Sequence, residues 1–173
     1  MIPNVNVNLS QEGLADGSML RNAIHEFTQE QDAAHFLYIL EIMRDSNIWI
    51  PCNMIMSDTD YSNIEQLVNQ AVEKDDLNSL IGMQFTNQDA IRMVPDILIN
   101  NGKYFFPVFT SPEEMGEYGM HFSKVQRHFP DAITMAIHNA KDITGVVVNA
   151  FTTPFILDCR FFETVQNMKS KFN

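Results

Sequence analysis

Apolar residues recur along this chain with two different periods, and the change of period predicts where helices and strands lie. Between Leu20 and Arg44 they recur every three or four residues, which predicts a helical region, and the polar stretch Thr28–Asp32 divides it into two helices. The run Ile48–Met56 is then typical of a strand. Pro51 has no backbone N–H to donate, so we expect this strand at a sheet edge or at a bulge.

The middle of the chain contains a strong hairpin signal. Asn101-Gly102 separates the apolar arms Ile97–Ile99 and Lys103–Thr110, and an Asn-Gly pair between such arms predicts a tight β-hairpin. Before it, the spacing of apolar residues predicts a short helix over Ile64–Val72, and Leu80–Phe85 is consistent with a short strand.

The apolar run Tyr104–Phe109 stops at a helix start. Ser111 has the side chain of an N-cap, Pro112 suits the first helical turn, and Glu114 is the third-position acid of a capping box. Gly119 then predicts the end of a short helix. Together these residues predict a rigid corner at which a buried strand passes into a helix.

The last third of the chain alternates between strand and helix patterns. Phe122–Phe129 is partly alternating and predicts a strand, and Pro130–Lys141 has one apolar face and predicts a helix. The β-branched run Gly145–Asn149 is typical of a strand buried on both faces. Phe155–Leu157 is expected to be its antiparallel neighbour, and Arg160–Lys171 a closing helix.

These elements predict an α+β fold, with a mixed β-sheet flanked by helices, formed as a single domain over residues 18–173. The sheet is expected to include the 97–110 hairpin and the 145–149 strand. Residues 1–17 are rich in Asn and are expected to form a flexible N-terminal arm. Val5, Val7 and Leu9 alternate with Asn, so a short edge strand is the alternative interpretation of that arm.

Charge and composition narrow the classes of partner. The chain has 173 residues with 11 basic and 22 acidic side chains, a net charge of −11. Nucleic acids and anionic membranes bind basic surfaces, so neither is an expected partner. No apolar run is long enough to span a bilayer, and the N-terminus lacks the basic and apolar regions of a signal peptide. We therefore expect a cytoplasmic protein, with Cys52 and Cys159 as buried free thiols.

Two patterns begin like metal sites but do not complete them. His25-Glu26 opens a zinc-protease helix motif, but Gln29 stands where the second His is required. Asp58 opens a calcium-loop pattern, but Asn63 and Asn69 replace its essential Gly and Glu. The sequence has no phosphate loop, dinucleotide fingerprint or nucleophile elbow either. We therefore expect no metal, no cofactor and no catalytic activity.

The order of these elements resembles a known family. Tyr104–Phe109 followed by Thr110-Ser111-Pro-Glu-Glu114, a helix, and then Gly145-Val-Val-Val-Asn149 resembles the N-terminal domain of SseB-like proteins, which are named for an enhanced serine sensitivity phenotype. The likeness extends over residues 20–160. Ala150 departs from it, because such proteins usually carry Pro after the Asn of the late strand. The resemblance implies a bacterial, cytoplasmic interaction or regulatory module, and it brings no catalytic activity with it.

The predicted sheet also suggests where a partner binds. If the strands over 104–109 and 145–149 are parallel, both end at the same sheet edge, where open α/β sheets usually bind ligands. We expect a non-catalytic protein-binding module with a contact surface at this edge. That surface comprises Thr110, Ser111, Glu114, Tyr118, Asn149, Phe151 and Thr152.

Two other functions remain open at this point. In the first alternative, a cleft at the ends of the strands over 104–109 and 145–149 binds a small molecule, and the protein is a small-ligand sensor or an enzyme. The second is a homodimer in which an exposed edge over Trp49–Met54 pairs with its copy.

Overall fold

The computed structural model describes residues 7–81 and 91–172, and the chain divides into two compact units. We call residues 1–52 together with 95–173 the main unit, and residues 53–94 the 53–94 unit. Helices and strands alternate along the chain, which confirms the α+β class. The separate 53–94 unit lies within the predicted domain and is a subdivision that the sequence pattern did not indicate.

The main unit includes a helix within the segment that was expected to be a flexible arm. Helix α1 spans Val7–Ala15, so the alternative of a strand at Val7 and Leu9 is wrong for these residues. Val5 lies outside the described residues. Leu14 of α1 is buried in the core, and α1 lies against α2. Tertiary packing of this kind forms a helix that the local sequence signals only weakly.

The two helices predicted over Leu20–Arg44 are confirmed as α2, Ser18–Gln29, and α3, Ala33–Asp45. They pack against each other, and residues 30–32 of the predicted polar stretch lie between them, whereas Thr28 and Gln29 belong to α2. The Asp32 side chain caps α3 by accepting a hydrogen bond from the His35 backbone N–H at 2.8 Å. The buried faces of the two helices are formed by Leu20, Ala23, Ile24, Ile39, Leu40, Ile42 and Met43.

A four-stranded sheet has the order β3-β4-β6-β7. Its strands are β3, Leu98–Asn100, β4, Lys103–Val108, β6, Ile143–Val148, and β7, Phe155–Asp158. Strands β4 and β6 are parallel, whereas the β3–β4 and β6–β7 pairs are antiparallel, so the sheet is mixed as predicted. The two parallel strands therefore end at the same sheet edge.

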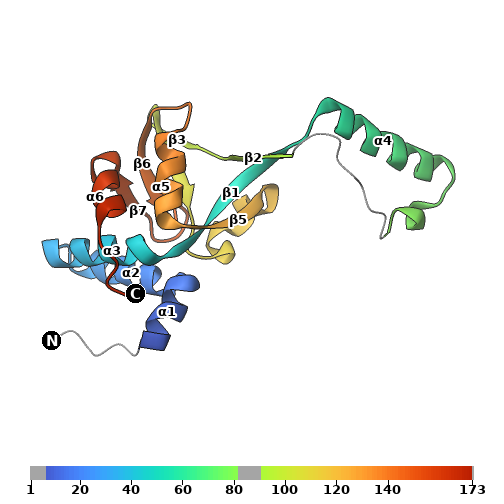
Figure 1. The fold of residues 1–173 in the computed structure, drawn as a ribbon. Coiled ribbons are helices and arrows are strands. Elements are labelled where there is room, and N and C mark those ends of the chain that lie inside the picture. The colour runs from blue at the N-terminus through green and yellow to red at the C-terminus, as the bar shows by residue number, and fades with distance from the viewer. Residues whose placement is uncertain (1–6, 82–90, 173) are drawn as a thin grey trace. The chain divides into compact units, whose positions relative to one another are not determined.

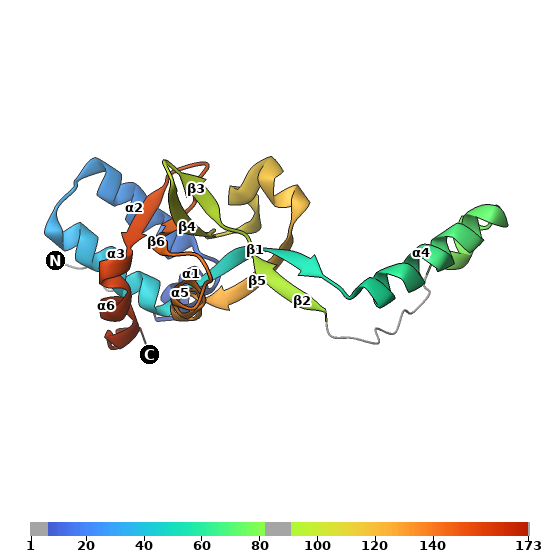
Figure 2. The ribbon, with the colours of Figure 1, turned by 90° about the horizontal axis from the view of Figure 1, so that it is seen from above.

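The hairpin between β3 and β4 is confirmed (Figures 1 and 2). Asn100 pairs with Lys103, and the two turn residues between them both have positive φ, 50° at Asn101 and 74° at Gly102. This is the backbone that a two-residue type I′ turn requires, and Asn followed by Gly adopts it at the lowest cost.

A second sheet has the order β2-β1-β5, with β1 over Asn47–Ile55, β2 over Arg92–Pro95 and β5 over Ser123–His128. Since β1 is the central strand, the expectation that Pro51 marks a sheet edge is wrong, and residues 47–52 of β1 pair with β5 along one side. Pairing of Trp49–Met54 with a second copy of the chain stays a prediction. The β1–β5 register is also continuous through Pro51, without a bulge.

The proline is tolerated because of what lies on the other side of β1. The N–H of Trp49 donates to Phe109 O at 2.7 Å and the N–H of Phe109 donates to Trp49 O at 2.9 Å, an isolated bridge facing away from β5. Backbone groups two residues apart face the same side of a strand. Pro51 therefore also turns its nitrogen away from β5, and only its carbonyl is needed there, as acceptor for Asp96 N–H at 2.9 Å.

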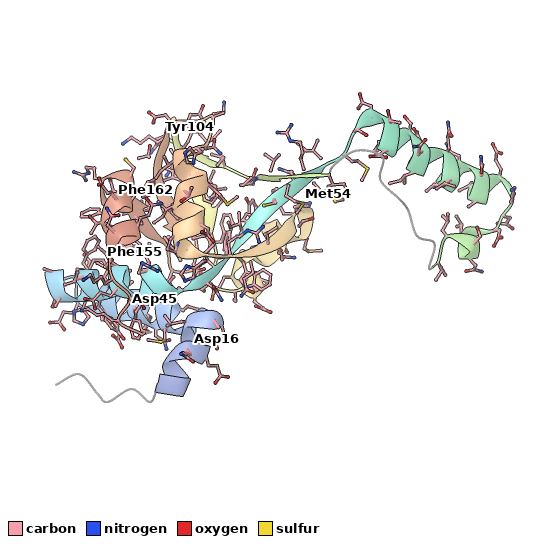
Figure 3. All side chains as sticks on the ribbon, in the orientation of Figure 1. Asp16, Asp45, Met54, Tyr104, Phe155 and Phe162 are labelled. Atoms are coloured by element: carbon pink, nitrogen blue, oxygen red, sulfur yellow. The ribbon has the colours of Figure 1, made fainter. Side chains whose placement is uncertain are left out.

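The remaining helices of the main unit are shorter than predicted. Helix α5 spans Phe129–Ile137, and the closing segment forms a 3₁₀ turn, η3, Cys159–Phe161, followed by α6, Phe162–Asn167. The core includes Phe155 and Phe162, which Figure 3 marks. Phe155 makes ring contacts with Phe27 and Phe36, which joins β7 to α2 and α3.

The 53–94 unit contains α4, Asp58–Glu73, and the 3₁₀ turn η1, Leu77–Leu80. The helix predicted over Ile64–Val72 is confirmed and is longer at its N-terminal end, where Ser57 Oγ accepts a hydrogen bond from Asp60 N–H at 3.1 Å. The strand predicted over Leu80–Phe85 falls mostly outside the described residues, and Leu80 itself is in η1. Among the described helices, none combines the length and apolarity needed to cross a membrane.

Candidate functional site at the ends of β4 and β6

Two polar side chains join the ends of the parallel strands. Thr110 follows β4 and Asn149 follows β6, and each is only 1% exposed. Asn149 Oδ1 accepts from Thr110 N–H at 2.9 Å, and Asn149 Nδ2 donates to Thr110 Oγ1 at 3.0 Å. The N–H of Asn149 donates to Val108 O at 3.0 Å, and φ of Asn149 is 51°. Asn tolerates the left-handed region better than other non-glycine residues, so this position combines a turn with a bridge.

The loop before α2 braces this junction from the other side. Gly17 has φ 80°, and a Cβ built at this residue would lie 2.1 Å from Thr110 O, so only glycine fits. Arg21, one turn into α2, donates from Nη1 to Thr110 Oγ1 at 3.1 Å. The end of β4 is therefore held by residues that are about 90 positions earlier in the sequence.

The segment after Thr110 turns as predicted but is capped differently. Residues Pro112–His121 form η2, a 3₁₀ helix kinked at Gly116, in place of a short helix ending at Gly119. Ser111 makes no side-chain cap, so the predicted capping box is wrong. The Glu114 carboxylate instead accepts a hydrogen bond from Thr152 Oγ1, which links η2 to the loop after β6.

Four aromatic rings cover this corner. Phe109 stacks with Phe151 at 5.9 Å between ring centroids, and Tyr118 lies 4.9 Å from Phe151 and 4.7 Å from Phe122. Phe109 is buried, whereas Phe151 is 52% exposed. The Tyr118 hydroxyl donates to Asp96 Oδ2, and burial together with this carboxylate raises the pKa of Tyr118 well above its usual value. The ring cluster is therefore held in place by the buried Phe109 and by Asp96, and it is exposed to solvent at Phe151.

A cavity of about 260 Å³ lies beside the corner, lined by Arg21, Asn22, Ile24, His25, Glu114, Asn149, Thr152 and Thr153. Its charged groups are of opposite sign. Arg21 and Glu114 each form a hydrogen bond with a threonine hydroxyl. Among the described residues, no ion pair links Arg21 to Glu114. The cavity thus presents a cation and an anion separately.

The predicted contact residues divide into two groups. Thr110 and Asn149 are buried and hydrogen-bonded to each other, so their side chains hold the corner and do not lie on its surface. Phe151 and Thr152 are exposed, and Ser111, Glu114 and Tyr118 are half-buried. Gly17, Arg21 and Asp96 also hold this corner, but the sequence did not predict their roles. No local signal marks them, because each reaches the corner only through long-range folding.

Two further observations concern thiols and metals. Cys52 is buried as predicted, and burial raises its thiol pKa, but Cys159 is exposed, so the prediction is wrong for that residue. Glu30, Asp32 and His35 place ligand atoms within 4.8 Å of one another between α2 and α3. Asp32 is already the cap of α3 and also contacts His35 Nδ1 at 2.8 Å, so helix capping accounts for this cluster.

The fold and the corner define a class: an α+β domain whose two parallel strand ends are closed by a Thr–Asn pair and covered by aromatic rings. The chain belongs to the SseB family, since the model described as SseB protein N-terminal domain matches residues 20–161. The match confirms the resemblance drawn from the sequence and includes the whole 53–94 unit. Searches of curated proteins and of solved structures each found no match.

Proposed function

We propose that this chain is a non-catalytic, cytoplasmic bacterial module that binds another protein through the corner at the ends of β4 and β6. The contact surface, called the corner surface below, consists of Glu114, Tyr118, Phe151 and Thr152. The observation that carries the proposal is the position of Phe151, half exposed while stacked on the buried Phe109.

The corner surface has the properties of an interaction hot spot. Aromatic side chains carry much of the energy of protein interfaces, and a ring that is already held in place loses little entropy on binding. Phe151 is held by Phe109 and Tyr118, and Tyr118 is in turn fixed by Asp96. Thr152 is oriented by its bond to Glu114. A partner therefore meets a preformed surface.

The charge around the corner surface narrows the partner's chemistry. Helix η2 carries Glu113, Glu114 and Glu117, of which Glu113 and Glu117 are exposed. A complementary segment presents an apolar side chain to Phe151 and a Lys or Arg to these carboxylates. Repulsion by the same carboxylates favours such a segment over an acidic one.

Co-purification from a lysate of the source cells tests the proposal with the full chain and four single variants. Phe151→Ala should lower recovery of a specific partner by about tenfold or more, which corresponds to about 1.4 kcal/mol. Ile156→Ala is the matched control, because Ile156 has the same exposed fraction, 52%, on β7. Equal recovery with both variants, or unchanged partners with Tyr118→Ala and Glu114→Lys, would show that the corner surface is not the binding site.

A small-ligand sensor or enzyme is the second candidate, and the cavity beside the corner favours it. Arg21 and Glu114 suit a molecule with both a carboxylate and an ammonium group. A thermal-shift screen of metabolites should then raise the melting temperature for such compounds, since a ligand of the native state stabilises it. Arg21→Gln should remove that rise, and the absence of any shift would exclude this candidate.

A further inference from the structure

The 53–94 unit is rich in exposed apolar side chains. It contributes eight of the fourteen large apolar residues that are exposed among the described part of the chain: Met54, Ile55, Tyr61, Val68, Val72, Leu77, Ile81 and Met93. In the same unit, the described residues that are buried are Asp60 and Ala71. A concentration of apolar surface of this kind marks an interaction site.

Much of this surface belongs to one face of α4. Tyr61, Ile64, Val68 and Val72 are spaced by three and four residues, which places them on one side of an α-helix. The exposed fractions are 63% for Tyr61, 40% for Val68 and 59% for Val72, and Ile64 is half-buried. The face is therefore continuous over three turns and open to solvent.

The charges beside this face are mostly of one sign. Every charged residue of α4 is acidic: Asp58, Asp60, Glu65 and Glu73. Over 53–81 and 91–94 the unit has six acidic residues against two basic ones, Lys74 and Arg92. A second copy of the chain would bring the same acids against them, and like charges across an interface are unfavourable. A basic partner is complementary.

We propose that the exposed face of α4 docks an amphipathic helix of a partner protein, with an apolar stripe flanked by Lys and Arg. The stripe packs on Tyr61, Ile64, Val68 and Val72, as apolar faces do when one helix lies along another. The basic flanks lie against Glu65 and Glu73, which speeds association and sets specificity. This surface belongs to the 53–94 unit, whereas the corner surface belongs to the main unit, and the two proposals rest on different residues.

A synthetic helix is the direct probe. A fluorescent peptide of about 18 residues, or five helical turns, carries a Leu stripe flanked by Lys and Arg. Its anisotropy should rise as it is titrated with the full-length protein. The same peptide with Glu at every basic position should bind at least about tenfold more weakly. Raising the salt concentration should weaken the basic peptide's binding, because salt screens exposed charges.

Variants of α4 locate the site. Val68→Gln together with Val72→Gln should weaken peptide binding about tenfold or more, and Glu65→Lys should weaken it as well. The matched control is Ile137→Gln, a helical residue of α5 that is also half exposed, at 52%, and it should bind the peptide normally. Phe151→Ala should bind it normally too, which separates this proposal from the corner surface.

Four results would overturn the proposal. The first is no binding of the basic peptide, and the second is equal binding of the acidic one. The third is a concentration-dependent dimer in light scattering that the Val68→Gln, Val72→Gln protein loses, which would make the occupant a second copy. The fourth is a lower melting temperature in that variant. Because Gln is a good helix former, the substitutions by themselves should not destabilise α4. A lower melting temperature would therefore mean that Val68 and Val72 already pack against another part of the chain.

Discussion

At the residue scale, Asn149 is the most informative position. Its side chain satisfies the buried Thr110 N–H, and its backbone lies in the left-handed region at φ 51°. We expect Asn149→Gly to lower the free energy of unfolding by about 2 kcal/mol, because a buried donor loses its acceptor. Asn149→Ala should cost about 1 kcal/mol more, since alanine is strained at this φ. Chemical denaturation of both variants measures the difference, and equal losses would contradict the strain argument.

Gly17 and Gly102 make a matched pair at the same scale. Both have positive φ, 80° and 74°, but a Cβ at Gly17 meets the Thr110 carbonyl, whereas at Gly102 it meets nothing within 4 Å. Gly102→Ala should therefore cost about 1 kcal/mol of backbone strain. Gly17→Ala should cost about 2 to 4 kcal/mol, because the carbonyl must also move. Thermal unfolding compares the two, and similar melting temperatures would show that the corner is not tightly packed there.

The Asp32–His35 pair should make the start of α3 sensitive to pH. Hydrogen bonds from His35 lower the pKa of Asp32 from 3.8, so its contribution is complete above 3.8 and is lost as the pH falls through the lowered value. The bond to Asp32 raises the pKa of His35 from 6.5, so its contribution is complete below 6.5 and is lost as the pH rises through the raised value. Local protection should be greatest between pH 3.8 and 6.5.

Hydrogen exchange at the first turn of α3 measures this window, after correction for intrinsic exchange rates. Asp32→Asn is the control, because it keeps a capping side chain but removes the charge that His35 senses. In that variant the decline of protection above pH 6.5 should become smaller. An unchanged profile would mean that the pair does not influence the cap.

At the element scale, the hairpin and α4 differ in what holds them. The β3–β4 hairpin is set by Asn101-Gly102 and by pairing within a four-stranded sheet. Helix α4 has little buried apolar surface, so its end groups matter more. Ser57→Ala removes the acceptor for Asp60 N–H and should lower the local stability of α4 by about 1 kcal/mol. Hydrogen exchange of the α4 amides reads this directly, and Ser62→Ala, an exposed residue within the helix, is the control.

At the scale of the whole molecule, the two units should open independently. Local stability follows buried apolar area, and the described residues of the 53–94 unit bury very little of it, whereas the main unit holds the hydrophobic core. We expect amides of α4 to exchange at a lower free energy of opening than those of β6. Limited proteolysis should also cut within 53–94 first. Uniform exchange across both units would contradict the division.

Local signals along the chain are enough to predict several elements of the fold. The Asn101-Gly102 turn, the two helices around Thr28–Asp32 and the buried run of β6 over 145–148 follow from backbone preference and apolar spacing, which act over a few residues. Those same patterns were enough to indicate the SseB family, which the match over 20–161 confirms. They placed the ends of β4 and β6 together only on the condition that the two strands are parallel, and the structure shows that they are.

The other features could not be predicted, because each of them depends on residues that are far apart in the chain. The α1 helix depends on packing against α2, and the tolerance of Pro51 depends on its neighbours across the sheet. Glu114, which local spacing assigns to a capping box, is bound instead by Thr152, 38 residues later. Hydrogen bonds and close packing form between groups that the fold brings together, and the spacing of residues along the sequence does not indicate which distant groups these are.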